Sequence, residues 1–128
     1  MSGQGSYVDD IKIPGMLHAA FLRSPHAHAR IRSVDVAAAL RMPGVEAVLT
    51  GDDILGIVPD LPTRSMSGEW EVDEFKAPEH PALAVGKVSY VGQTVAVVVA
   101  QDPGQARDAL ELIQVDYEPL PVVLDPWE

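Results

Sequence analysis

The sequence predicts an α+β fold in which a mixed β-sheet combines with two helices, at about 36–42 and 103–114, and a long irregular loop at about 55–80. Three observations support this prediction. An uncharged, β-branched run from Thr94 to Ala100 is typical of a strand that is buried on both faces. Two segments carry helix-forming residues between start and stop signals. Shorter stretches beside those segments have the apolar alternation of half-buried strands.

The composition is that of one ordinary globular domain, which we place at residues 1–128. Apolar residues make up 47% and charged residues 22% of the chain, and a chain of this length buries roughly two-thirds of its unfolded surface. The absence of cysteine excludes disulfides, cysteine nucleophiles and cysteine-ligated Fe–S clusters. The sequence has no basic-then-apolar start and no long apolar run, so we expect a cytoplasmic protein without a membrane span.

The net charge of −10 is unevenly distributed along the chain. Residues 1–42 carry five basic and three acidic side chains, whereas residues 43–128 carry four basic and sixteen acidic ones. An acidic surface repels nucleic-acid phosphates and anionic lipids, so neither is expected as a partner. The small basic part of the chain is the exception that a function has to explain.

Basic residues recur at every second position of one predicted strand. A first strand from Met16 to Arg23 is broken by Ser24-Pro25, and a second strand begins at His26. Side chains alternate between the two faces of a strand. One face therefore carries four residues that we call the basic stripe: His26, His28, Arg30 and Arg32.

Three interpretations of the basic stripe are open. The His-x-His spacing suits a metal site if His18, His80 or a carboxylate supplies a third ligand, but two fixed guanidinium charges disfavour a cation. The same charges suit a small anion or an acidic partner. The third interpretation is an ordinary solvated strand face. The four groups repel one another unless a negative group lies opposite. That group could come from this domain's own acidic residues or from the rest of a larger parent protein, and we favour the parent.

Both helices have recognisable ends. In the first, Asp35 is the expected N-cap and Pro43-Gly44 the stop. In the second, Asp102 is the expected N-cap, Pro103 suits the first helical position and Gln105 stands at the capping-box position. The apolar spacing of the second helix predicts one face packed on the sheet, formed by Ala106, Ala109, Leu110 and Ile113.

The remaining strands follow from apolar patterns bounded by turn residues. Residues 45–50 predict a strand that ends in a turn at 51–53, and residues 115–118 predict another before the extended segment 119–121. The stretch 88–100 contains the central strand, with Val97 expected in the core. Within it, Val91-Gly92 suggests a bulge or a close backbone approach.

The irregular loop carries aromatic residues among carboxylates. Trp70 and Phe75 lie in the acidic run 69–75, and prolines interrupt the segment at both ends. Long loops in compact domains tend to be functional, covered by a partner or disordered. Paired acids could in principle perform acid–base chemistry, but no nucleophile or apolar pocket accompanies them, so a solvated acidic loop is favoured.

Several stretches together resemble the N-terminal α/β hammerhead domain of the molybdenum-binding large subunit in the xanthine dehydrogenase, aldehyde oxidase and carbon monoxide dehydrogenase family. They occur in the family's order and span nearly the whole chain apart from 55–80. The matching stretches are Gly5-Ser6-Tyr7-Val8-Asp9-Asp10, Leu17 through Asp35, Pro43-Gly44-Val45, Leu49-Thr50-Gly51, Val91-Gly92-Gln93 and Ala109 through Pro121.

The resemblance implies a role in a much longer enzyme. Members of the family hydroxylate a substrate carbon or oxidise carbon monoxide at a molybdenum–molybdopterin cofactor, with oxygen from water. Electrons leave through Fe–S clusters to FAD on partner domains or subunits. The residues that hold molybdopterin and the catalytic base lie in other domains, so we assign no catalytic, cofactor-binding or metal-binding residue to this chain.

Within such a parent, the resemblance implies a structural and docking domain that contacts the molybdenum-binding domains and the Fe–S and flavin partners. Gln93 is expected to bond to main chain rather than to a cofactor. An independent module that binds a metal or small anion through the basic stripe is the alternative. The candidate interface residues are Arg23, His26, His28, Arg30, Arg32, Trp70 and Phe75.

Overall fold

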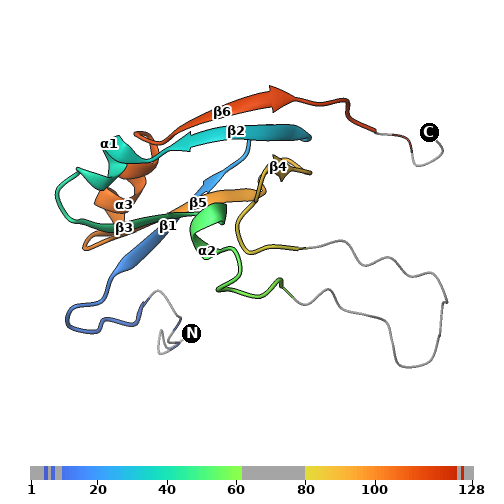
Figure 1. Cartoon of the computed structure of the whole chain (residues 1–128). Helices are drawn as coiled ribbons and strands as arrows, with labels where there is room; N and C mark the ends of the chain where they lie inside the picture. The colour runs from blue at the N-terminus through green and yellow to red at the C-terminus, as the bar shows by residue number, and fades with distance from the viewer. Residues whose placement is uncertain (1–4, 6, 8–9, 62–79, 124, 126–128) are drawn as a thin grey trace, which may run out of the picture.

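The computed structural model describes residues 5, 7, 10–61, 80–123 and 125, and every structural statement below concerns these residues. It contains strands and short helices (Figure 1). In chain order they are β1 (His18–Arg23), β2 (Ala29–Asp35), α1 (Ala37–Leu40), β3 (Val45–Thr50), α2 (Gly51–Ile54), β4 (Lys87–Val88), β5 (Thr94–Ala100), α3 (Pro103–Leu110) and β6 (Gln114–Pro119).

The strands form two antiparallel three-stranded sheets, in the orders β1-β5-β3 and β4-β2-β6. Successive strands alternate strictly between the two sheets, so each connection along the chain crosses from one sheet to the other. The α+β class is confirmed, but the single mixed sheet expected from the sequence is instead two antiparallel sheets. The sequence pattern identifies strands without specifying which strand pairs with which.

One face of the β1-β5-β3 sheet is covered by α3. Ala96, Val98 and Ala100 of β5 have no exposed surface and pack with Ala106 and Ala109 of α3 in the larger core cluster. Figure 1 shows α1 and α3 together at one end of the molecule, beside the sheets. The predicted apolar face of the second helix is confirmed at Ala106, Ala109 and Leu110, which belong to or pack against this cluster. The helix ends at Leu110 rather than at about 114, so Ile113 is buried in the same cluster but lies beyond the helix.

A smaller core cluster lies where the two sheets approach each other. It joins Ala29 of β2, Val88 of β4 and Val95 of β5 with Ala84, and Val88 and Val95 are fully buried. Val97 differs from the expectation because it is only partly buried. The run from Thr94 to Ala100 is thus covered completely on one face and incompletely on the other.

The start of α3 follows the sequence signals in part. The Asp102 carboxylate accepts hydrogen bonds from the backbone N–H groups of Gly104 and Gln105, at 2.7 and 3.3 Å, and Pro103 occupies the first helical position. The capping-box role expected for Gln105 is wrong. Its Oε1 is buried without a hydrogen-bond partner, because the side chain packs over Gly44, which has a φ of 84°.

The short helices differ from the predicted boundaries. α1 has Val36 rather than Asp35 at its N-cap, and Asp35 instead accepts a hydrogen bond from the Ala37 N–H at 2.9 Å. The turn expected at 51–53 is the helix α2, which has a reciprocal capping box between Thr50 and Asp53. Hydrogen bonds from the Thr50 hydroxyl and N–H lower the pKa of the Asp53 carboxyl.

The stretch 88–100 is broken rather than continuous. β4 and β5 belong to different sheets and are separated by residues 89–93. The close backbone approach expected at Val91-Gly92 is confirmed, because the Gly92 N–H donates to the Ser24 carbonyl at 2.8 Å and the Ser24 N–H to the Gln93 carbonyl at 2.9 Å. Gly92 has a φ of 88°, which favours glycine.

In the described residues, no helix is long and apolar enough to cross a membrane.

Candidate partner interface

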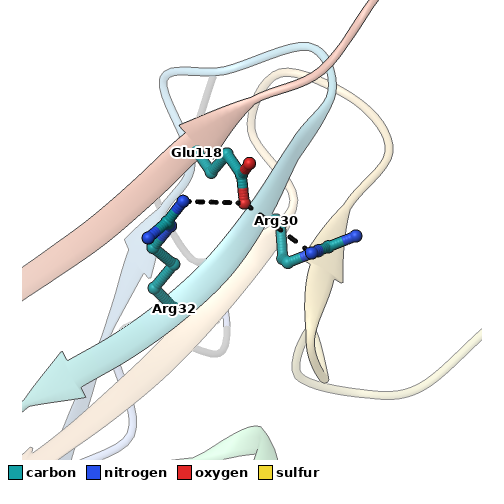
Figure 2. Close-up of polar contacts among 3 residues, drawn as sticks. All are labelled: Arg30, Arg32 and Glu118. Carbon is teal, nitrogen blue, oxygen red and sulfur yellow. Dashed lines mark ion pairs between the residues drawn. The ribbon is translucent and has the colours of Figure 1, made fainter.

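The two arginines of the basic stripe share one carboxylate of this chain. Arg30 and Glu118 are directly opposite each other on β2 and β6. The Glu118 Oε2 atom lies 3.7 Å from Arg30 Nη1 and 3.3 Å from Arg32 Nη2, and Figure 2 shows the carboxylate between the two guanidinium groups. The opposing charge that we expected from a parent protein therefore comes, at least in part, from within the domain.

A β-bulge at Arg32 shapes this charged group. Ile31 pairs with Tyr117 and Ser33 pairs with Asp116, which leaves Arg32 as an extra residue on β2. Ala29 and Ile31 point inwards before the bulge, and Val34 points inwards after it. Because a bulge shifts the alternation by one residue, Arg30 and Arg32 can both reach Glu118 while Val34 returns to the core.

His26 lies before β2 rather than within it, since the strand starts at Ala29 and not at His26 as predicted. Its ring packs on Tyr117, with ring centroids 4.8 Å apart. Its N–H donates to the Ser24 hydroxyl at 3.0 Å, and that hydroxyl donates to the His26 carbonyl at 3.1 Å. Burial raises the pKa of the Tyr117 hydroxyl, and a hydrogen bond with Ser24 partly opposes this effect.

His28 is bound to the segment that follows β6. Its Nδ1 lies 2.7 Å from the Pro121 carbonyl oxygen, and the Leu120 N–H donates to the His28 carbonyl at 3.0 Å. A carbonyl oxygen only accepts hydrogen bonds, so Nδ1 carries the hydrogen. Only Nε2 of this ring remains available for any further ligand.

Arg23 connects the end of β1 to the turn before β5. Its Nη1 donates to the Gly92 carbonyl at 2.9 Å. All five described candidate interface residues thus have a partner within the chain. Trp70 and Phe75, the other two candidates, lie outside the described residues.

The arrangement does not assemble a metal site from the residues that the structure describes. No group of three or more His, Asp or Glu side chains among them is placed to hold a metal ion. His18 is the first residue of β1, whereas His26 and His28 follow Arg23 at the other end of that strand. The length of β1 therefore separates His18 from the other two histidines. The described residues therefore do not supply the third ligand that the His-x-His spacing would need.

Gln93 is the side chain that we weighed as a contact to the pterin cofactor that the resemblance implies, and it is 8% exposed. Its Oε1 accepts a hydrogen bond from the Ser89 N–H at 2.7 Å, which confirms the expected bond to main chain. We derive no step of a reaction through the cofactor in this chain.

The sequence analysis missed a second surface, on the β1-β5-β3 sheet. On the side away from α3, the pairing brings six apolar residues into two rows. We call this the free sheet face, and its rows are Phe21–Val97–Leu49 and Ala19–Val99–Ala47. Phe21 is 50% and Leu49 38% exposed. The alternation in residues 17–22 was visible in the sequence, but it does not reveal which faces are covered.

Comparison with known proteins places the chain in a family. The family profile described as "Aldehyde oxidase and xanthine dehydrogenase, a/b hammerhead domain" matches residues 2–121. The carbon monoxide dehydrogenase large chain of Afipia carboxidovorans is 47% identical over 127 residues, which is 98% of this chain and 14% of that protein. The xanthine dehydrogenase molybdenum-binding subunit of Escherichia coli is 36% identical over 98% of this chain and 16% of its own length.

The fold agrees with these sequence matches. The crystal structure of quinoline 2-oxidoreductase from Pseudomonas putida 86 superposes with a TM-score of 0.81 and 44% identity, covering 94% of this chain and 15% of that chain. This chain thus spans about a seventh of the length of these three relatives. On both sequence and fold, it belongs to the a/b hammerhead domain family of aldehyde oxidases and xanthine dehydrogenases.

Proposed function

We propose that this chain serves as the N-terminal structural and docking domain of a molybdenum hydroxylase large subunit. One observation carries the proposal: the match covers 98% of this chain but only 14% of the carbon monoxide dehydrogenase large chain. A segment with that relation to its relatives contributes to a larger polypeptide. The remaining part of the subunit then carries the molybdenum chemistry.

The chemistry of the described residues supports a docking role. The charged and polar groups of the basic stripe already have partners within the chain, whereas several large apolar side chains are exposed. Isolated proteins rarely expose large contiguous apolar patches, and such patches mark contact surfaces. The partners are the molybdenum-binding domains of the same subunit, with Fe–S and FAD-containing partners in the full enzyme.

The alternative is an independent module that binds a small anion or metal through the basic stripe. An anion would compete with Glu118 for Arg30 and Arg32, because that carboxylate lies within 4 Å of both guanidinium groups. Docking is therefore the better supported function. The parent enzyme would be an oxidoreductase whose cofactors lie outside this chain.

A domain exchange tests the proposal. Residues 1–121 would replace the matched segment in the carbon monoxide dehydrogenase large chain of Afipia carboxidovorans, expressed together with the other subunits of that enzyme. We expect an assembled complex that retains molybdenum, measured by size-exclusion chromatography and elemental analysis. The control is the host's own segment reinserted through the same junctions. A control that assembles beside an exchanged chain that does not would contradict the proposal.

A further inference from the structure

We propose that the free sheet face is the surface through which this domain docks, and that its partner is an uncharged aliphatic surface of the remaining large-subunit polypeptide. The inference rests on the function proposed above and deepens it. It assigns the energetically important contact to Phe21, Leu49 and Val97 rather than to the basic stripe.

The geometry of the free sheet face favours an extended contact. Phe21 and Leu49 lie on either side of Val97 in one row, and Ala19 and Ala47 lie on either side of Val99 in the next. Neither row contains a polar or charged side chain. A sheet face of this kind presents small aliphatic groups flanked by one aromatic ring, so a close-fitting partner can bury it without leaving polar atoms unpaired.

The opposite face of the same sheet provides the reference. Ala96, Val98 and Ala100 are completely buried beneath α3. Val97 and Val99 alternate with them along β5 and are only partly buried. Both faces are apolar, although only one is covered by the described part of the chain.

The charges identify which partner fits. The rows carry no charge, so charge complementarity does not attract an acidic or basic partner to them. A second copy would bring together two chains of net charge −10, and this repulsion opposes self-association. The remaining candidate for the partner is the rest of the large subunit, because the matched segment is only 14% of the carbon monoxide dehydrogenase large chain. The occupant that fits is therefore the rest of the same subunit.

The test uses the exchanged large chain described above, with Phe21→Ser and Leu49→Thr introduced together. Removing central apolar anchors of an interface typically weakens it by about tenfold or more. We therefore expect the yield of assembled complex to fall by about tenfold. The matched control is Leu40→Ser with Leu112→Ser, which alters two other exposed leucines (48% and 41%) that lie off the free sheet face. This control is expected to leave the yield unchanged.

Hydroxyl-radical footprinting of unmodified chains tests the same contact without any substitution. In the 128-residue chain, Phe21 and Leu49 should be oxidised readily, whereas in the exchanged subunit their oxidation should fall to the level of a buried side chain. Leu112 should react equally in both. Unchanged oxidation of Phe21 and Leu49 in an assembled subunit would overturn the inference and leave the proposed function standing.

Three other results would also overturn it. Equal losses from the free-face and control variants would show that the effect is not specific to this face. A 128-residue chain that dimerises, and that becomes monomeric with Phe21→Ser and Leu49→Thr, would assign the face to a second copy. Failure of the unmodified exchanged chain to assemble, beside a successful control, would contradict the proposed function and this inference together.

Discussion

The two faces of β5 are both apolar, but they differ in how completely they are covered. Towards α3, Ala96, Val98 and Ala100 are fully buried. On the other side, Val97 lies between Phe21 and Leu49, and it is only partly buried. Val99 lies between Ala19 and Ala47, and it is also only partly buried. An apolar run on both faces of a strand therefore indicates that both faces favour burial. It does not indicate that residues of the same domain bury both faces.

The largest expected effect is on the covered face. Val98→Asp would place a carboxylate in the apolar cluster beneath α3, where Val98 has no exposed surface. We expect the free energy of unfolding of the 128-residue chain to fall by more than about 3 kcal/mol, because an unpaired buried charge is among the most destabilising substitutions. Urea unfolding followed by circular dichroism measures this. A variant that unfolds cooperatively at the wild-type midpoint would show that the α3 side is not the core.

Val97→Asp is the matched substitution on the free sheet face. Because Val97 is only partly buried, the carboxylate can remain hydrated, and the loss in the same urea experiment should be under about 2 kcal/mol. The comparison depends on the difference in the free energy of unfolding between Val98→Asp and Val97→Asp. Equal losses would mean that the faces are equally covered in solution.

The packing of α3 on the sheet can be weakened by removing the cap at the start of this helix. Asp102→Ala removes the carboxylate that accepts hydrogen bonds from the Gly104 and Gln105 N–H groups. The expected loss is about 1 kcal/mol, which is typical of an N-cap. Asp102→Asn is the control, since it can accept the same hydrogen bonds and should retain most of the stability. If Asp102→Ala left the midpoint unchanged, α3 would not depend on this cap.

The smallest effect is expected at the charged group on the second sheet. The side chains of Arg30 and Arg32 are 63% and 58% exposed, and that of Glu118 is 36% exposed. Arg30→Ser with Arg32→Ser should change the free energy of unfolding by less than about 1 kcal/mol, as exposed ion pairs do. Glu118→Gln should have a similarly small effect that decreases with added salt. A large loss from either would show that this group contributes to the core.

The sequence predicted the elements better than their arrangement. Asp102-Pro103 located the start of α3, and the β-branched run located β5, because these signals are local. The division into two sheets was not predicted, since antiparallel pairing depends on partners far apart in the sequence. The capping box of Thr50 and Asp53 was present in the sequence as a Thr-x-x-Asp spacing, but was interpreted as a turn.

The candidate interface was predicted from the most noticeable residue types. His26, His28, Arg30 and Arg32 stand out because charged alternation is rare, yet each has a partner on β6, its continuation or nearby backbone. Their pairing depends on Glu118 and Pro121, which lie far away in the sequence. The apolar alternation at Ala19 and Phe21 is ordinary by comparison, so only the structure distinguishes its exposed side from a core.

The strict alternation of strands between the sheets has a consequence for how the chain folds. Among the strands that the structure describes, β1 and β3 pair only with β5, and β2 pairs only with β4 and β6. During synthesis, none of the first three strands has a described pairing partner until Lys87 has been made. Neither sheet contains a hairpin of consecutive strands, so the contacts are long-range and folding should be slow for the size of the chain. Until β5 and β6 emerge, the early strands have unpaired edges, and such edges are prone to pair with other chains.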